Sequence, residues 1–167
     1  MTDPFFSIRL EQPGDCPAID LLNDAAFGPG RFARTAYRLR EGVPHDPALS
    51  FVALTDDRLM GSVRLTPIAI GGDDALLLGP LAVNPEVSGR GIGRRLVRVA
   101  VEEAAALGHR LVLLVGDAPY YAPLGFELVT PGAITLPGPV DPRRLLAARL
   151  GDSAHDIKGE ARSIRGR

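Results

Sequence analysis

Cysteine and histidine are scarce in this sequence. Cys16 is the only cysteine among 167 residues, which excludes an internal disulfide and any metal cluster built on cysteine. Because it stands at the start of a predicted helix, Cys16 is expected to be a small buried hydrophobic residue. The three histidines are scattered without the spacing of metal ligands, so the sequence predicts no metal site.

Long apolar runs and an excess of one charge are also missing. No run of about 18 apolar residues occurs, and the opening MTDPFFSIRL lacks the basic start and apolar core of a signal peptide. We therefore expect a cytoplasmic protein that has no membrane partner. The formal net charge is −1, so no overall field attracts the chain to nucleic acid, and any anion site must be built locally.

The hydrophobic pattern predicts one mixed α/β domain over 1–167, because a chain of this length can bury its own core. Strands are expected at 6–11, 49–55, 59–70, 75–84, 110–117 and 126–129. Helices are expected at 16–28, 31–42 and 92–107, with a short helix or turn at 118–125. The helix at 92–107 would connect two parallel strands of an otherwise mostly antiparallel sheet.

The end of the chain carries one more helix signal. Asp141 has the character of a helix N-cap, and Pro142 suits the first helical position that follows. Residues 157–167 are expected to form an added strand or to be disordered.

Gly79-Pro80 interrupts the apolar run at 75–84. Proline cannot donate to a strand ladder, so we expect the strand to bulge or split here. Such a bulge would free polar backbone groups that a neighbouring strand would otherwise bind. The alternative is a bend that only relieves sheet twist.

The segment NPEVSGRGIGRRLV, residues 84–97, places three glycines directly before a helix. Glycines let backbone N–H groups converge, and the helix adds its unpaired N–H groups and its dipole, so the segment favours an anion. A Walker loop is excluded because Lys158 is the only lysine, and a dinucleotide fingerprint fits poorly because Arg94 stands at a glycine position. The alternative is a tight strand-to-helix turn without a ligand.

Two segments, LGPLAVNPEVSGRGIGRRLVRVAVEEA and VLLVGDAPYYAPLGFELV, resemble the Gcn5-related N-acetyltransferases (GNAT). The family loop reads Gln or Arg, two residues, Gly, any residue, then Gly or Ala, and it matches 88–93 with serine in the first position. The resemblance covers about 6–130 and leaves 131–167 as a C-terminal extension. LGPLAV, GDAPYY and LPGPVDP are similar to a bacterial subgroup described as YhbS-like. The resemblance implies a mixed, mostly antiparallel sheet that splays between its fourth and fifth strands and has flanking helices.

The same resemblance implies an N-acetyltransferase that uses acetyl-CoA as acyl donor. In this family acetyl-CoA lies where the fourth and fifth strands separate. The pantetheine arm would then meet Leu81, Ala82 and Val83. The pyrophosphate would be held by backbone N–H groups of Ser88, Gly89, Arg90, Gly91, Ile92, Gly93 and Arg94.

Catalysis would need a proton for the departing thiolate and a donor for the oxyanion. Tyr121, separated by three residues from Gly125-Phe126, occupies the position where the family commonly places its general acid. The backbone N–H of Leu81 is the expected oxyanion donor. The strand at 75–83 contains no Glu, Asp or His, so the general base stays open among Asp117, His45, Glu86 and a chain of water molecules.

The acceptor would be a primary amine of a small molecule or a protein. Its binding site would be walled by about 32–40 and by residues after Phe126, and the arginines of that wall would suit an acidic acceptor. Two other functions stay open, a non-catalytic acyl-CoA-binding or sensing module and a mononucleotide-binding protein. Dimers are common in the family, so a homodimer is one expected assembly.

Overall fold

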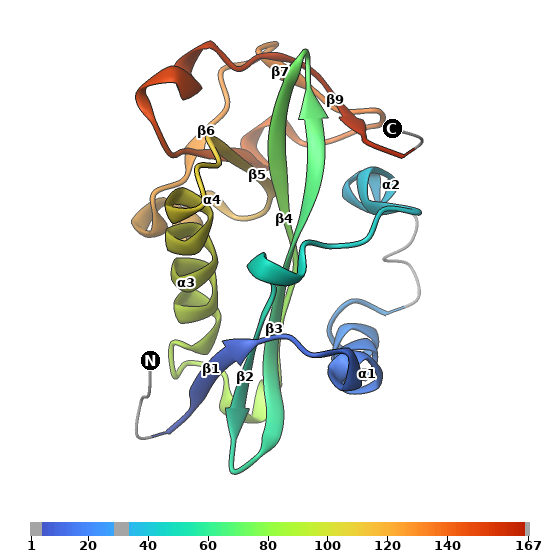
Figure 1. Ribbon diagram of the computed structural model, residues 1–167, viewed down its shortest axis with the longest axis vertical. Coiled ribbons are helices and arrows are strands. Elements are labelled where there is room, and N and C mark those ends of the chain that lie inside the picture. Colours follow the sequence, from blue (N-terminus) through green and yellow to red (C-terminus); the bar gives the residue numbers. More distant parts are fainter. Residues whose placement is uncertain (1–4, 29–33, 166–167) are drawn as a thin grey trace.

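The computed structural model describes residues 5–28 and 34–165 (Figure 1). Its strands are β1 (Ser7–Leu10), β2 (Phe51–Thr55), β3 (Arg58–Ile70), β4 (Asp73–Val83), β5 (Leu111–Val115), β6 (Glu127–Leu128), β7 (Ile134–Thr135), β8 (Leu145–Arg149) and β9 (Gly159–Ser163). Its α-helices are α1 (Cys16–Phe27), α2 (Thr35–Arg40), α3 (Ile92–Ala106) and α4 (Ala118–Tyr121).

The strands form a mixed sheet in the order β1-β2-β3-β4-β5-β8-β6. Neighbours are antiparallel along this path except β4 and β5, which are parallel and are connected through α3. The predicted fold, a mostly antiparallel sheet with one parallel pair made by the crossover helix, is therefore confirmed. The sheet is extended by β9, within the segment 157–167 for which an added strand was one of two expectations; β9 pairs with β3 and, in parallel, with β7.

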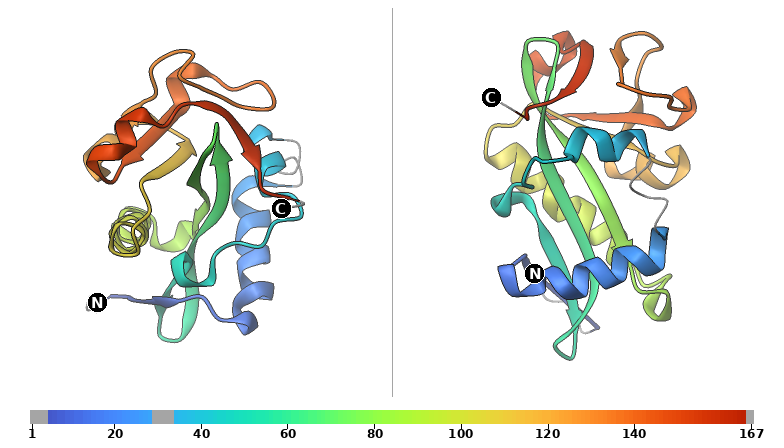
Figure 2. Two further views of the ribbon diagram at one scale, coloured as in Figure 1. Left: turned by 45° about the horizontal axis from the view of Figure 1, so that its top comes forward. Right: turned by 90° about the vertical axis from the view of Figure 1, so that its right-hand side faces the viewer.

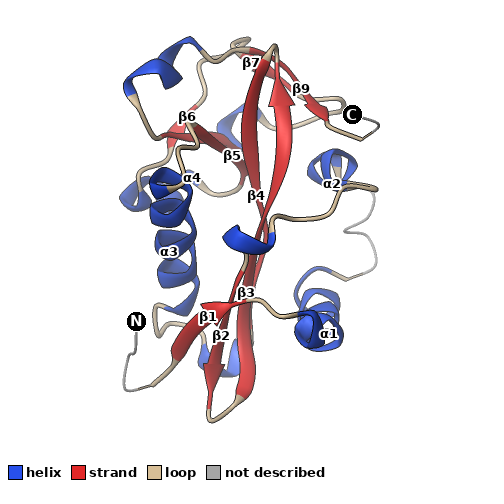
Figure 3. Ribbon diagram, viewed as in Figure 1, coloured by secondary structure: helices blue, strands red, loops and turns tan. Residues whose placement is uncertain are grey.

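Helices cover both faces of the sheet, with α3 on one side and α1 and α2 on the other (Figures 1 and 3). The division follows the period of two along the strands. Leu76 and Leu78 of β4 belong to the same buried cluster as the apolar stripe of α3, whereas Leu77 packs in a second cluster with Leu39 of α2. Figure 2 shows α1 and α2 lying across the long β3–β4 hairpin.

The strands β4 and β5 separate halfway along β4. They pair only at Leu76↔Val112 and Leu77↔Leu113, and the rest of β4 lies beside β3 alone. Between β3 and β4 the register passes from Val63↔Leu81 to Leu65↔Leu78, so Gly79 and Pro80 together oppose the single residue Arg64. The predicted bulge at Gly79-Pro80 and the predicted splay of the sheet are both present.

The helix predicted after Asp141 is present only as one short turn. Asp141 does cap a turn, because its carboxylate accepts a hydrogen bond of 2.9 Å from the Arg143 N–H, and Pro142 is the first position of that turn. The turn is a 3₁₀ helix that stops at Arg144, and the next residues form β8. The apolar segment Leu145–Arg149 pairs with β5, whose free edge decides its conformation over the local cap signal. Further on, residues 159–163 form the added strand β9.

Two smaller predictions also differ from the structure. The helix expected at 31–42 comprises Thr35–Arg40, because Glu41 already has an extended backbone, and residues 31–33 lie outside the described part of the chain. Cys16 is partly exposed rather than buried, and its Sγ lies 4.0 Å from Glu11 Oε1. Among residues 5–28 and 34–165, no helix has the length and apolar character needed to span a bilayer.

Candidate active site

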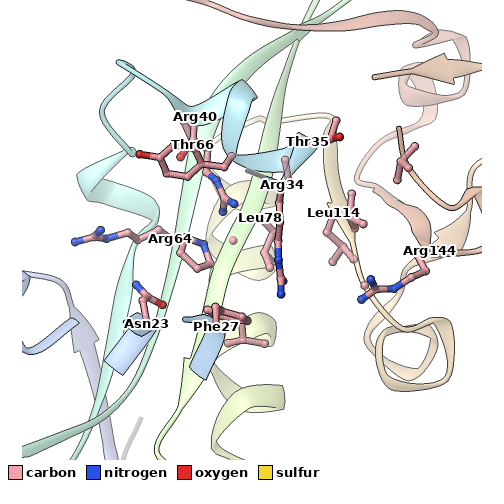
Figure 4. Close-up of a pocket in the computed structure, with 18 of the residues that line it drawn as sticks. Asn23, Phe27, Arg34, Thr35, Arg40, Arg64, Thr66, Leu78, Leu114 and Arg144 are labelled. Carbon is pink, nitrogen blue, oxygen red and sulfur yellow. The ribbon is translucent and has the colours of Figure 1, made fainter. Parts of the chain in front are cut away.

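A large cavity of about 1010 Å³ opens beside the bulge of β4 (Figure 4). Its lining comes from α1, from α2 and the turn that follows it, from the middle of β3 and β4, from the end of β5, from α4, and from the segment that leads into β8. Leu78, Gly79, Pro80 and Leu81 form one wall where β4 has left β5. The splayed strands therefore border a cavity that is large enough for a drug-sized ligand.

The glycine loop, residues 88–93, follows β4 after the short 3₁₀ turn Pro85–Val87. Gly89 and Gly91 have φ of +80° and +79°, the left-handed region that favours glycine. Gly91 is the N-cap of α3 and offers no capping side chain, so the first N–H groups of the helix point to the loop without an intrahelical acceptor. This arrangement has the donors and the dipole of an anion site. Ser88 is exposed and is not the cap of the helix.

The loop adjoins the cavity through Tyr120. A Cβ placed on Gly93 would lie 2.5 Å from the Tyr120 hydroxyl, so any larger residue at 93 would displace the end of the Tyr120 side chain. Arg94 lies over the Tyr120 ring, with Cζ 5.5 Å from the ring centroid. Among the described residues, the cavity lining includes Leu81 and Tyr120 but not Ala82, Val83 or 88–94. The predicted cofactor residues are thus adjacent along β4 and the loop, and they meet the cavity at Leu81.

Tyr121 lines the cavity at the end of α4. Its ring contacts those of Tyr120 and Phe126 edge-on, with centroid distances of 4.8 Å and 5.7 Å, and it lies against Gly116 at the end of β5. Burial raises the pKa of the Tyr121 phenol to about 12. Tyr121 therefore keeps its proton at neutral pH and is available as a hydrogen-bond or proton donor.

The three base candidates of the sequence differ in position. His45 and Asp117 line the cavity, whereas Glu86 lies outside it among the described residues, on the 3₁₀ turn after β4. Asp117 is exposed, and its Oδ1 lies 3.4 Å from Arg144 Nε. Glu86 is exposed as well and lies 4.0 Å from Arg58. His45 is thus the candidate whose ring faces the cavity from a partly buried position.

Glu11, at the end of β1, holds His45 in place. Its side chain is 4% exposed, and its Oε1 lies 3.2 Å from His45 Nε2 and 2.7 Å from an Arg64 nitrogen. Burial raises the pKa of the Glu11 carboxyl, but hydrogen bonds from His45 and Arg64 outweigh burial and hold the pKa at about 2. Because Glu11 is ionised and can only accept, His45 Nε2 is the ring nitrogen that carries a hydrogen toward it, and Nδ1 is the ring nitrogen that does not face Glu11.

The segment 32–40, expected to wall the acceptor site, borders the cavity in its described part. Thr35, Tyr37 and Arg40 line the cavity, whereas Arg38 is exposed and outside it. The other expected wall, residues after Phe126, corresponds to the segment that precedes β8, which joins α2 through a hydrogen bond of 2.7 Å from the Thr35 hydroxyl to the Pro139 carbonyl. Glu11 was missed by the sequence analysis, since its partners lie far away in sequence. Within the described ranges, no group of three or more His, Cys, Asp or Glu side chains could hold a metal ion.

Comparison with known proteins gives the same family as the loop and the splayed strands. Residues 46–128 match the domain described as "Acetyltransferase (GNAT) domain". The uncharacterized N-acetyltransferase YjhQ of Escherichia coli is 34% identical over 131 residues, which cover 76% of this chain and 72% of YjhQ. Another E. coli relative, the uncharacterized N-acetyltransferase YhbS, is 31% identical over 150 residues, or 88% of this chain and 89% of YhbS.

Solved structures agree with the sequence relatives. The crystal structure of E. coli YhbS in complex with CoA superposes with a TM-score of 0.81 at 30% identity, covering 98% of this chain and 93% of that chain. A GNAT acetyltransferase from Brucella melitensis in complex with acetyl-CoA superposes with a TM-score of 0.61 at 30% identity, covering 90% and 98%. A parallel strand pair that opens beside a glycine loop, together with these relatives, places the chain in the GNAT family of N-acetyltransferases.

Proposed function

We propose that this protein transfers the acetyl group of acetyl-CoA directly to a primary amine of a small molecule or a protein. The observation that carries the proposal is the opening between β4 and β5, which Tyr121 lines and which the glycine loop adjoins through Tyr120. Acetyl-CoA needs an anion site for its pyrophosphate, an unpaired strand edge for the amides of its pantetheine arm, and a proton donor for the sulfur that leaves as a thiolate. CoA or acetyl-CoA is bound by YhbS and by the Brucella enzyme, which supports this reading of the opening.

In the proposed complex, the backbone of Leu81, Ala82 and Val83 binds the pantetheine amides. The side of β4 that faces β5 has no strand partner in this stretch among the described residues, so the cofactor would complete the ladder. The N–H groups of 88–94 bind the pyrophosphate. The glycines at 89 and 91 supply the backbone conformation, so the identity of Ser88 matters less than theirs.

The reaction proceeds by attack of the neutral amine nitrogen on the thioester carbonyl carbon. The N–H of Leu81 donates to the developing oxyanion. The carbon–sulfur bond then breaks, and the electron pair leaves with sulfur as a thiolate. Tyr121 gives the thiolate its proton, and the amine loses one proton to a base. Acetylated amine and free CoA are the products.

His45 is the base that the geometry supports. The ion pair of Glu11 with Arg64 fixes the ring through Nε2 and leaves Nδ1 as an acceptor beside the cavity. Asp117 is exposed and lies close to Arg144, so it is the weaker candidate. A base supplied from outside β4 explains how residues 75–83 of that strand, which include no Glu, Asp or His, can border the reaction.

The proposal is tested by measuring free CoA thiol with a chromogenic thiol reagent while a panel of primary amines is supplied with acetyl-CoA. Acetylated product is identified by mass spectrometry, and a reaction without amine corrects for hydrolysis. We expect amine-dependent release in the wild type and a strong loss in Tyr121→Phe, with a smaller loss in Tyr120→Phe. Full activity in Tyr121→Phe would exclude the acid role of Tyr121. Tight acetyl-CoA binding without product from any amine would instead support a non-catalytic acyl-CoA-binding module.

A further inference from the structure

Arg40 brings a partly buried positive charge to the cavity wall. Its Nε is inaccessible to solvent and has no hydrogen-bond partner, and no carboxylate pairs with the guanidinium among the described residues. Burial lowers the pKa of Arg40 to about 10, which is still far above neutral pH. A charged guanidinium that is largely withdrawn from water and has no carboxylate partner among the described residues is unfavourable, and an anion in the cavity would relieve it.

The guanidinium lies next to the proposed reaction centre. A Cβ on Gly79 would be 2.8 Å from an Arg40 terminal nitrogen, so the group covers the bulge, and the absent side chain of Gly79 makes room for it. The proposed oxyanion donor, Leu81, is two residues further along β4, and two residues of strand span about 7 Å. An anion bound to Arg40 would therefore be only a few bonds away from an amine that attacks the thioester.

A second arginine adds to the charge on this side. Arg34, the N-cap of α2, lines the same cavity and lies over Phe27, with Cζ 5.4 Å from the ring centroid. Figure 4 shows the side chains of Arg34 and Arg40 descending from α2 into the cavity, with Arg144 entering from the opposite side. Arg34 and Arg40 are close enough that the charge of Arg34 contributes to the lowered pKa of Arg40.

The other charges of the lining are largely compensated. Arg64 is held by Glu11 at 2.7 Å, and Arg144 lies 3.4 Å from Asp117. Asp141 is paired with Arg143 at 3.0 Å. Asp20 is exposed on α1 and acts on Arg64. The α2 side of the cavity therefore keeps a net positive charge, which Arg34 and Arg40 carry.

We propose that the acceptor is a compact primary amine that also carries a carboxylate or a phosphate, and that Arg40, with Arg34, binds this anionic group. The inference rests on the proposed acetyltransferase function and specifies its substrate class. A guanidinium fork binds either anion with two parallel hydrogen bonds, which orients the other end of the acceptor. Bound at Arg40, the anion would direct the amine to the thioester beside Leu81.

The test compares acceptors that differ only in the anionic group. The pairs are 4-aminobutanoate with 4-aminobutanamide, and 3-aminopropyl phosphate with 3-aminopropanol, each with saturating acetyl-CoA. One charge-assisted contact corresponds to a preference of about 10- to 150-fold in kcat/KM, which we expect in at least one pair. The carboxylate and phosphate pairs distinguish the two anions. In Arg40→Met the preference should fall below about threefold, whereas the matched control Arg38→Met, on the same helix but outside the cavity, should keep it.

If no acceptor of the pairs is turned over, a second measurement tests the anion site by binding alone. Binding of 4-aminobutanoate and of 3-aminopropyl phosphate to the CoA-saturated protein is measured by titration calorimetry, and circular dichroism checks that each variant is folded. Binding that disappears in Arg40→Met and persists in Arg38→Met supports the inference. Equal kcat/KM within both pairs, or no binding of either anion, overturns it. Absence of acetyl transfer to all amines, neutral ones included, refutes the proposed function instead, so the two failures are distinct.

Discussion

The charge of Glu11 can be removed with little change in the shape of its side chain. Its buried carboxylate receives hydrogen bonds of 3.0 Å and 2.7 Å from Arg64 and lies 3.2 Å from His45. Glu11→Gln keeps the size of the side chain and one acceptor oxygen, but it removes the negative charge. The variant therefore leaves Arg64 without a counter-charge and releases the His45 ring.

The size of the effect follows from the pKa of Glu11. The carboxyl ionises at about 2 in the folded protein against an ordinary value of 4.5, and each pH unit of difference corresponds to about 1.4 kcal/mol. The charge of Glu11 thus contributes on the order of 3 kcal/mol to the free energy of unfolding. Because the folded-state pKa is the lower one, this contribution is complete above about pH 5 and is lost as the pH falls toward 2.

The assay is urea unfolding of wild type and Glu11→Gln, followed by circular dichroism between pH 3 and pH 7. At pH 7 we expect the variant to be less stable by about 3 kcal/mol, which for a chain of this length lowers the Tm by about 6–12 °C. The difference should shrink steadily below about pH 4.5. Glu103→Gln, at an exposed position on α3, serves as control and should leave the free energy of unfolding unchanged between pH 3 and pH 7.

Two results would refute this reasoning. A difference that stays constant from pH 7 to pH 3 would mean that the charge of Glu11 is not what stabilises the fold. A difference well below 1 kcal/mol at pH 7 would mean that the Glu11–Arg64–His45 cluster is not formed as described.

Three further predictions concern the reaction and the cofactor. Tyr121→Phe should lower kcat about 10²- to 10⁴-fold with little change in the KM for acetyl-CoA, and since burial raises the Tyr121 pKa to about 12, the wild-type pH–rate profile should show no decline from phenol ionisation below about pH 11. His45→Gln should lower kcat at pH 7 by about 10²-fold or more, and calorimetry should find CoA binding unchanged. Ser88→Ala should weaken CoA binding only modestly, whereas Gly91→Val should abolish it, because valine would have to adopt φ of +79°; equal effects in the titration would contradict the assignment of the contacts to the backbone.

Local sequence features predicted the parts of the site that depend on local geometry. The bulge follows from a proline that cannot donate within a strand, and the loop follows from glycines at positive φ before a helix, as at Gly89 and Gly91. Both effects act within a few residues. They therefore do not depend on contacts with distant segments, and for this reason the bulge at Pro80 and the glycine loop could be predicted from the sequence alone.

Contacts between distant segments could not be predicted in the same way. Glu11 and Arg64 are 53 positions apart, and Thr35 and Pro139 are 104 positions apart. The segment after Asp141 shows the conflict directly, because a correct cap signal is followed by a strand that completes the edge of β5. Local propensity was overruled by tertiary pairing there, and the same pairing brings Arg144 to the cavity.

The central claim is that the opening between β4 and β5 is the acetyl-CoA site, and a crystal structure of this protein with CoA tests it most directly. We expect the pantetheine arm to run along Leu81–Val83 on the side that β5 leaves free, with the pyrophosphate against the N–H groups of 88–94 and the sulfur within reach of the Tyr121 hydroxyl. CoA bound at another surface, or a pantetheine arm outside the opening, would contradict the account.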